Sequence, residues 1–297
     1  MLGLNMSTLK ISEQAKGLIL TLIGVLAVVP DSILIRLINA DILTITFWRA
    51  LIPGLIISLG VLLFYRRQTV SFVKSPGLSG IIFVISFALG NILFVISIEL
   101  TKVANALFIL STSPIYAMLI SRFFLSEPIT FRMLLTIFGA LLGIGIITIG
   151  TNHEVELLFL GDLSALGGAL CLAISLTSAR SASNFSMIPA IGISSLILAL
   201  CIVSFIQPFN LERLDWIYIL LLGGFFTPIA VCLIHTGPRF ISSSEVSLLM
   251  LLEAILAPIL AWYILSEYPG LKTIIGGLIV LTVLITSNFL AFKKVKK

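Results

Sequence analysis

The stretch SPIYAMLISRFFLSEPITFR at residues 113–132 has a counterpart 140 residues further along the chain, EAILAPILAWYILSEYPGLK at residues 253–272. The two stretches align without a gap, and each passes from an apolar run into Leu-Ser-Glu, then a proline, then a basic residue. Chance gives scattered identities between leucine-rich helices, but it rarely keeps an acid, a helix break and a base in one order. The alignment therefore predicts an internal duplication.

The composition places both copies in a membrane. Of the 297 residues, 59% are hydrophobic and 10% are charged, and the mean hydropathy is +1.21. A soluble domain usually has about 25% charged residues. Apolar runs near the roughly 20 residues that cross a bilayer recur along the chain, whereas a membrane barrel would show short alternating segments. We therefore predict an all-α polytopic membrane protein. Its net charge of +5 lacks the basic pattern of a nucleic-acid-binding protein.

Charged and Pro/Gly-marked gaps divide the chain into ten predicted transmembrane helices with short connections. Their expected ranges are 17–38, 43–64, 78–98, 103–124, 131–150, 159–180, 188–207, 215–236, 243–265 and 271–292. Because each copy has five spans and five is odd, the second copy enters the membrane from the opposite face. The sequence thus predicts two inverted five-helix repeats, at residues 1–150 and 151–297, the common plan of secondary transporters with a site between the repeats.

Basic residues are distributed unevenly over the predicted loops. With both termini in the cytoplasm, 13 of the 18 Lys and Arg residues lie in the inner segments, whereas acids gather in the outer loops. This asymmetry follows the positive-inside rule and supports the count of ten spans. We expect a multi-pass protein of the cell's inner membrane, with a first helix from Gly17 that is retained rather than cleaved. The C-terminal lysines are expected to contact anionic membrane lipids.

One acid interrupts the second copy of the repeat. Glu253 lies about ten residues from either end of its predicted span, near the middle of the bilayer. An ionised acid at that depth costs roughly 2.5–3.5 kcal/mol, and such residues usually face the bundle interior or a wet pathway. The structural alternative is a protonated or paired Glu253 that joins two helices. The functional alternative is a cavity acid that binds a cationic substrate group or a coupling proton.

Further polar residues occur at helical spacing in the fourth span. Ser113 aligns with Glu253, and Asn105 and Tyr116 fall on the same face of its helix. Asn91 lies in the middle of the third span. These side chains could line a substrate cavity, or they could form ordinary interhelical hydrogen bonds.

Asp31 and Arg49 are predicted to form an ion pair. The turn between the first two spans centres near Asp41, so the two residues share a depth in an antiparallel hairpin. Charged residues within a membrane normally pair. The pair either holds the two helices together or anchors the amino or carboxylate group of a zwitterionic substrate. Pro30 is expected to kink the first helix beside Asp31, and Arg36 to snorkel towards the outer surface.

Two weaker patterns concern protons and helix contacts. His235 is predicted near the cytoplasmic end of its helix, at a depth close to that of Glu245, which shares a helix face with Glu253. A His235–Glu245 pair could gate protons, or the histidine could be an ordinary surface residue. Gly139 and Gly143 form a GxxxG match that permits close helix contact, within the monomer or across a homodimer.

Four segments resemble the EamA family of the drug/metabolite transporter superfamily. They are FWRALIPG (47–54), TSPIYAMLISRFFLSEP (112–128), GDLSALGGALCLA (161–173) and LLEAILAPILAWYILSE (251–267). The resemblance covers nearly the whole chain. It implies an inner-membrane permease of small metabolites, with a central cavity lined by helices one to four and six to nine and with helices five and ten at the periphery. The chain departs from the family pattern at Leu172, where many relatives have Trp, and at Ala254, where relatives often have Pro.

The residues and the resemblance together predict a secondary transporter. It would move a small polar metabolite, such as an amino acid or an amine, by alternating access, with or without coupled protons. The sequence contains no phosphate loop, nucleophile elbow, HExxH motif or Cys/His metal cluster, so we expect no catalytic residues, metal site or cofactor. The alternatives are a lipid flippase, an intramembrane enzyme and a non-transporting receptor.

Overall fold

The computed structural model describes three continuous segments and scattered positions in two more: residues 13–65, 77–126 and 155–266, and positions within 131–146 and 268–286. Every regular element in these residues is helical. Eight helical stretches in the described part of the chain are long and apolar enough to cross a membrane, and they match eight predicted spans to within a few residues. The predicted spans 131–150 and 271–292 lie outside the continuously described residues.

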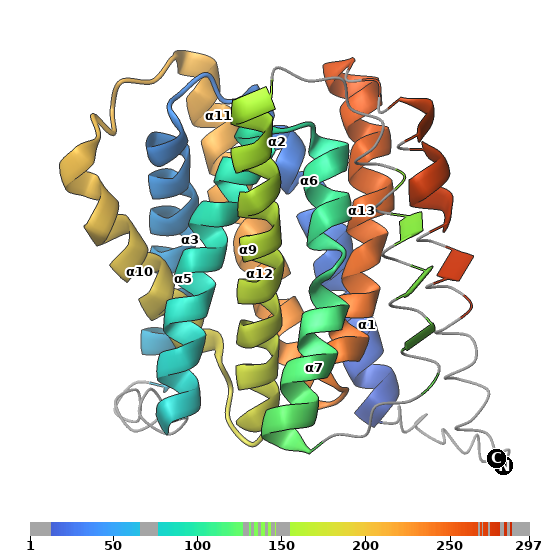
Figure 1. Cartoon of the computed structure of the whole chain (residues 1–297). Helices are drawn as coiled ribbons and strands as arrows, with labels where there is room; N and C mark the ends of the chain where they lie inside the picture. Colours follow the sequence, from blue (N-terminus) through green and yellow to red (C-terminus); the bar gives the residue numbers. More distant parts are fainter. Residues whose placement is uncertain are drawn as a thin grey trace, which may run out of the picture.

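The spans stand side by side as a bundle, and several consist of more than one helical segment (Figure 1). In chain order the segments are α1 (Glu13–Val28) with α2 (Asp31–Leu37), α3 (Ile42–Tyr65), α5 (Gly77–Leu100), α6 (Val103–Leu110) with α7 (Ser113–Leu125), α9 (Val155–Ser181), α10 (Ile188–Ile202) with η2 (Val203–Phe205), α11 (Arg213–Leu221) with η3 (Leu222–Phe226), α12 (Thr227–Thr236) and η4 (Gly237–Arg239), and α13 (Ser243–Leu265). Helices of the first half pack on helices of the second: α1 on α12, α3 on α10, α5 on α9 and α7 on α13.

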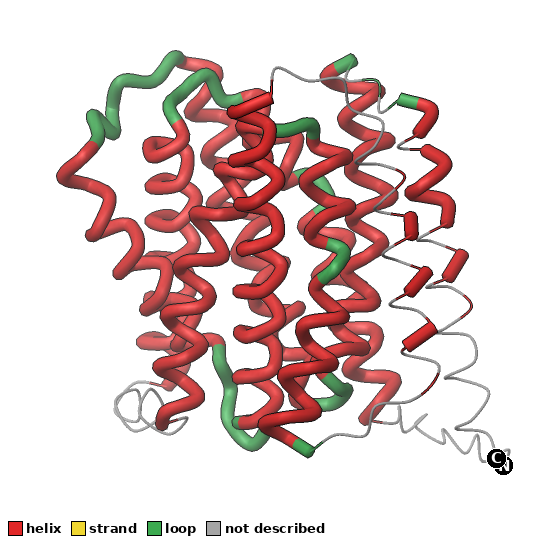
Figure 2. Tube along the Cα trace, in the orientation of Figure 1, coloured by secondary structure: helices red, strands yellow, loops and turns green. Residues whose placement is uncertain are grey.

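Two spans are interrupted half-way along the bundle, where Figure 2 shows loop-coloured segments between helices. The first break separates α1 from α2 at Pro30, and the second separates α6 from α7 at residues 111–112, just before Pro114. Proline has no backbone N–H and clashes with the preceding turn, so each proline ends the helix before it. The predicted kink at Pro30 is confirmed. A membrane protein allows a helix break at mid-depth only beside protein or a cavity, where the backbone groups that the break frees find other partners.

The helices within the aligned stretches, residues 113–132 and 253–272, end in the same geometry. α7 ends at Ser126 with φ 55° and ψ 24°, and α13 ends at Ser266 with φ 56° and ψ 23°. The backbone N–H of Ser126 bonds to the carbonyl of Ser121, and that of Ser266 bonds to the carbonyl of Ala261, again 140 residues apart. α7 ends at the lower edge of Figure 1 and α13 ends at the upper edge, so the two run in opposite directions.

Large apolar side chains cover the outside of the bundle, and alanines, branched aliphatic residues and a few phenylalanines fill its inside. Leu63, Phe123 and Phe124 are among many large apolar residues that point outwards, as expected for contact with lipid. Ala165, Ala169 and Ala173 recur every fourth residue of α9 and are fully buried, which lets α9 approach its neighbours closely. The most extended buried cluster joins α2, α3, α5, α6, α11 and α13 at the upper end, and the candidate site lies below it.

Candidate functional site

A cavity of about 120 Å³ lies in the middle of the bundle. A single water needs about 10–15 Å³ by this measure, so the cavity has room for several waters or part of a small metabolite. Its lining comes from α1, α3, α5, the α6–α7 span, α9, α12 and α13, which are seven of the eight helical spans that the family resemblance implied. α10 contributes no lining residue among those described.

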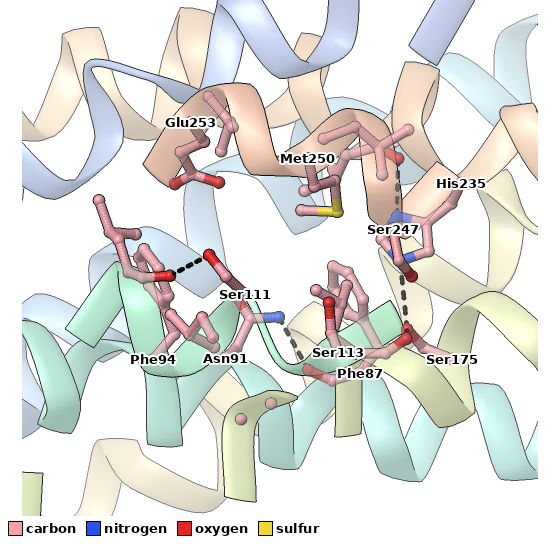
Figure 3. A pocket seen from close by; sticks show the side chains of 18 of the residues that line it. Phe87, Asn91, Phe94, Ser111, Ser113, Ser175, His235, Ser247, Met250 and Glu253 are labelled. Atoms are coloured by element: carbon pink, nitrogen blue, oxygen red, sulfur yellow. Dashed lines mark hydrogen bonds between the residues drawn. The ribbon is translucent and has the colours of Figure 1, made fainter. Parts of the chain in front are cut away.

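Glu253 supplies the acid of this cavity. It lies near the middle of α13 and is 6% exposed. Figure 3 shows its carboxylate extending into the cavity towards the side that carries Asn91 and Ser111. Its Oε1 atom has no hydrogen-bond partner among the described residues. A buried polar atom without a partner is costly, and the cost is higher for a charged group, so this carboxyl requires a proton or a ligand.

The predicted ion pair between Asp31 and Arg49 is confirmed. Arg49 donates from Nη2 and from Nε to the same carboxylate oxygen, Asp31 Oδ2, over 2.6 Å and 2.9 Å. The hydroxyl of Thr227 donates to the other oxygen, Oδ1, over 2.8 Å. Asp31 is fully buried and is not among the residues that line the cavity. Both oxygens of the Asp31 carboxylate therefore have hydrogen-bond partners within the protein.

Arg49 reaches from this pair to the cavity wall. Its Nη1 donates to Asn91 Oδ1, and its guanidinium carbon lies 5.0 Å from the centre of the Phe94 ring. Asn91 in turn donates from Nδ2 to the carbonyl of Phe87 over 2.9 Å, which fixes the orientation of its amide. Because Asp31 balances the charge of Arg49, an ionised Glu253 would leave the centre of the bundle with one net negative charge.

The polar stripe predicted on the fourth span is split by its helix break. Ser113, at the start of α7, lines the cavity, together with Ser111 of the break itself. Asn105 lies on α6 and Tyr116 on α7, and neither belongs to the lining. Asn105 is buried, and its Oδ1 atom has no hydrogen-bond partner among the described residues. The face calculated for one continuous helix does not persist across residues 111–112.

His235 lies in the cavity wall and is neither a surface residue nor a partner of Glu245. It is 4% exposed and lines the cavity beside Ser175. Its Nδ1 bonds to the carbonyl of Val231 over 3.0 Å, and its Nε2 lies 3.3 Å from the hydroxyl of Ser175.

Glu245 serves the start of α13 instead. Its Oε2 accepts hydrogen bonds from the backbone N–H of Ser242 over 2.9 Å and from the Ser242 hydroxyl over 3.0 Å, while Ser242 Oγ accepts from the Glu245 N–H. This reciprocal arrangement is a capping box, which satisfies backbone donors at the first turn of a helix. Glu245 is outside the cavity lining, so the expected pair with His235 is not formed.

Two further predictions about contacts are decided by neighbouring helices. Arg36 donates to the carbonyls of Glu99 and Thr101 over 3.3 Å and 2.6 Å, so it caps the end of α5 rather than snorkelling to water. A cation there also complements the helix dipole. Gly139 packs so closely against Val283 of the same chain that a Cβ at Gly139 would lie 2.5 Å from Val283 Cγ2. This contact accounts for Gly139 within the monomer, and the homodimer stays a prediction.

Several lining residues carry no signal in the sequence. They are serines and apolar residues of long helices or of the α6–α7 break: Ser86, Phe87, Ser111, Ser175, Ser247 and Met250. Most of the cavity serines bond to a carbonyl of their own helix, as many buried serines in membrane helices do. Leu172 and Ala254, the two departures from the family pattern, also line the cavity.

Comparison with known proteins gives one family and one fold. The sequence model of the EamA-like transporter family matches residues 15–149 and 159–289, in two copies. A solved structure described as "Crystal structure of protein" is 16% identical to this chain and superposes with a TM-score of 0.73. The match covers 93% of this chain and 98% of that one, and likeness at this identity shows a shared fold. No curated protein matches the chain.

Proposed function

Because the chain belongs to the EamA-like transporter family and is therefore a multi-pass membrane transporter, we propose that it moves a small metabolite with an amino group across the cell's inner membrane by alternating access. The substrate class follows from charge. Asp31 and Arg49 neutralise one another, whereas Glu253 faces the cavity with Oε1 unpartnered among the described residues. An ammonium group would supply both the missing hydrogen bond and the compensating charge. This unpaired acid is the observation that carries the proposal.

We assign distinct roles to the polar residues around Glu253. Asp31 holds Arg49 in place, since both of its oxygens are bonded within the protein. Arg49 and Asn91 line the cavity together with Ser111 and can donate hydrogen bonds to a carboxylate or another acceptor of the substrate. An amino acid or a substituted amine fits this set.

The arrangement of the helices supports alternating access between two inverted halves, residues 1–150 and 151–297. α7 and α13 carry the duplicated stretches, run in opposite directions and pack on one another. The cavity draws its lining from both halves. In transporters of this plan the halves rock about a central site, which is exposed to each side in turn.

Basic residues support cytoplasmic termini. Lys16 lies over the Phe240 ring at 4.7 Å and Arg239 lies over the same ring at 5.9 Å. Arg180 donates to the carbonyl of Pro238 over 3.2 Å at the same end of the bundle. A membrane end that gathers lysine and arginine in this way faces the cytoplasm under the positive-inside rule.

Proton coupling follows if Glu253 exchanges a proton for the substrate. A buried carboxyl cannot remain ionised and unpaired without a large cost, so release of an ammonium group would be followed by uptake of a proton. One site would then carry either species, which is the simplest basis for antiport.

The test is efflux from liposomes that contain the purified transporter and are loaded with a mixture of amino acids and primary amines. We expect saturable efflux of a subset of these compounds, chemically unchanged. Glu253→Gln should lower it about 10- to 100-fold, the loss expected for a hydrogen bond to a charged group. Glu245→Gln is the matched control, since it alters an acid of the same helix outside the cavity, and it should retain efflux. If Glu253→Gln transports the same compounds with an unchanged pH profile, the proposal is wrong.

A further inference from the structure

We propose that the His235 end of the cavity is a second substrate subsite, which accepts a hydrogen bond from a hydroxyl or amide group at the end of the substrate remote from its amine. The inference rests on the proposed function and narrows its substrate class to amines with a neutral polar group at the other end. It is carried by the hydrogen bonds of His235 and Ser175, by the aromatic frame around the imidazole, and by the distance of this group from Glu253.

The Nε2 atom of His235 shares its nearest donor, the Ser175 hydroxyl, with a backbone carbonyl. The carbonyl of Val231 can only accept, so the proton of the neutral ring lies on Nδ1, which is 3.0 Å away, and Nε2 carries a lone pair. Its neighbour Ser175 has a single hydroxyl proton. That hydroxyl bonds to the carbonyl of Leu172 over 2.8 Å, a shorter contact than the 3.3 Å to Nε2. One proton cannot serve both acceptors, so Nε2 is available to a donor in the cavity.

The aromatic frame fixes the direction in which Nε2 points. Phe83 and Phe87 stack on one another with ring centres 5.6 Å apart. The imidazole stands nearly perpendicular to both, at 5.2 Å from Phe83 and 5.1 Å from Phe87. Only 4% of His235 is exposed, so the ring has little freedom to turn. A rigid acceptor in an apolar frame favours a neutral donor, because the frame offers no compensation for a second charge.

The two polar ends of the cavity are separated along α13. Figure 3 shows Glu253 at one end and His235, beside Ser175 and Ser247, at the other, with Met250 between them. Ser247 and Glu253 are six residues apart on α13, which corresponds to roughly 9 Å at the helical rise of 1.5 Å per residue. A substrate that touches both ends therefore has an apolar middle and two polar termini.

A proton relay accounts less well for His235. The acid expected to partner it, Glu245, is committed to the capping box of α13. In the described part of the chain, the polar and aromatic groups that contact the imidazole are a carbonyl, a hydroxyl and two phenyl rings, and none of these four is acidic. These contacts agree better with a neutral imidazole whose Nε2 accepts a hydrogen bond from a ligand.

The experiment compares two amines of equal heavy-atom count, 5-aminopentan-1-ol and hexylamine, by calorimetric titration of the purified full-length transporter in detergent. The pair differs in a terminal hydroxyl against a methyl group. His235→Phe removes the acceptor, and His235→Gln restores one at a similar reach. Thr236→Val is the matched control, because that neighbouring hydroxyl bonds to the carbonyl of Cys232 and is outside the cavity lining.

We expect His235→Phe to lower the ratio of alcohol affinity to alkylamine affinity by roughly 3- to 10-fold, the loss of one neutral hydrogen bond. The hexylamine affinity should persist, which also shows that the variant is folded, and His235→Gln should restore most of the ratio. An unchanged ratio with both amines still bound overturns the subsite and leaves the proposed function standing. Binding of neither amine to the unmodified protein also overturns the subsite, and the proposed function is then decided by the efflux of the amino acids in the liposome mixture.

Discussion

The ion pair of Asp31 and Arg49 allows a quantitative test of whether these two buried charges compensate one another. Arg49→Gln would leave the Asp31 carboxylate buried with the Thr227 hydroxyl as its remaining partner, and Asp31→Asn would leave the Arg49 cation with Asn91. Removing one partner of a buried pair costs about 3–5 kcal/mol, because the other charge stays uncompensated. The double variant has no net buried charge, so its loss should fall short of the sum by about 2–3 kcal/mol, the upper range for residues in contact.

The measurement is the free energy of unfolding in mixed detergent micelles for the parent, the two single variants and the double variant. A control cycle combines Asp31→Asn with Thr46→Val. Thr46 lies on the same helix as Arg49 and is buried, but its hydroxyl bonds to the carbonyl of Ile42. That cycle should be additive to within about 0.5 kcal/mol. Additive losses for Asp31 and Arg49, or a negligible loss from either single variant, would contradict a static pair and with it the assignment of the free charge to Glu253.

Three other predictions follow from local geometry. Gly168 lines the cavity, so Gly168→Val should narrow it and lower the transport rate about tenfold or more. Gly60→Val is the control, because a Cβ there meets open space, and it should leave the transport rate unchanged. Equal effects of the two variants would show that Gly168 does not lie on the substrate pathway. Gly237→Ala should destabilise the protein by about 1–3 kcal/mol, because its Cβ would clash with Thr21 Oγ1 and crowd Val246. Combining it with Thr21→Ala should recover part of that loss in thermal unfolding, and no recovery would contradict the clash. Ser126→Gly and Ser266→Gly should each stabilise the protein by about 1 kcal/mol, since both serines adopt positive φ; a loss at either position would show that its side chain matters more than its backbone.

Depth in the membrane could be predicted from the sequence because it needs only a count of residues from the nearest loop. That count placed Asp31 level with Arg49 and Glu253 near mid-bilayer, and the structure agrees with the first directly. Hydrophobic run lengths fixed the eight described spans for the same reason. Both predictions depend only on the number of residues between a position and the nearest end of its span.

The direction in which a side chain faces is harder to predict, because it depends on an unbroken helical period. The stripe of Asn105, Ser113 and Tyr116 assumed 3.6 residues per turn from residue 105 to residue 116. The break at residues 111–112 resets that phase, and Ser113 alone of the three lines the cavity. Pro114 was the local signal for the break, since a helix rarely continues through the residues before a proline.

Glu245 and His235 show the difference between a local signal that was present and a contact that had none. Ser242 and Glu245 have the spacing of a capping box at the start of an apolar run, so the role of Glu245 was encoded within four residues. The position of His235 depends on Phe83 and Phe87, more than 140 residues earlier. That contact exists because α5 and α12 meet at the same cavity, which is a property of the packed bundle.

The energetic cost of a polar group decides how visible it is in a sequence. Ser86 and Ser111 line the cavity, yet each hydroxyl bonds to a carbonyl of its own helix, Ile82 over 2.8 Å and Leu107 over 2.7 Å. Such a serine costs little anywhere in a membrane helix, so its presence predicts no site. Glu253 has no comparable local partner, and a buried acid of that kind needs compensation from outside its helix. Glu253, whose burial costs the most free energy, could therefore be identified from the sequence. The hydroxyls around it, whose burial costs little, could be found only in the structure.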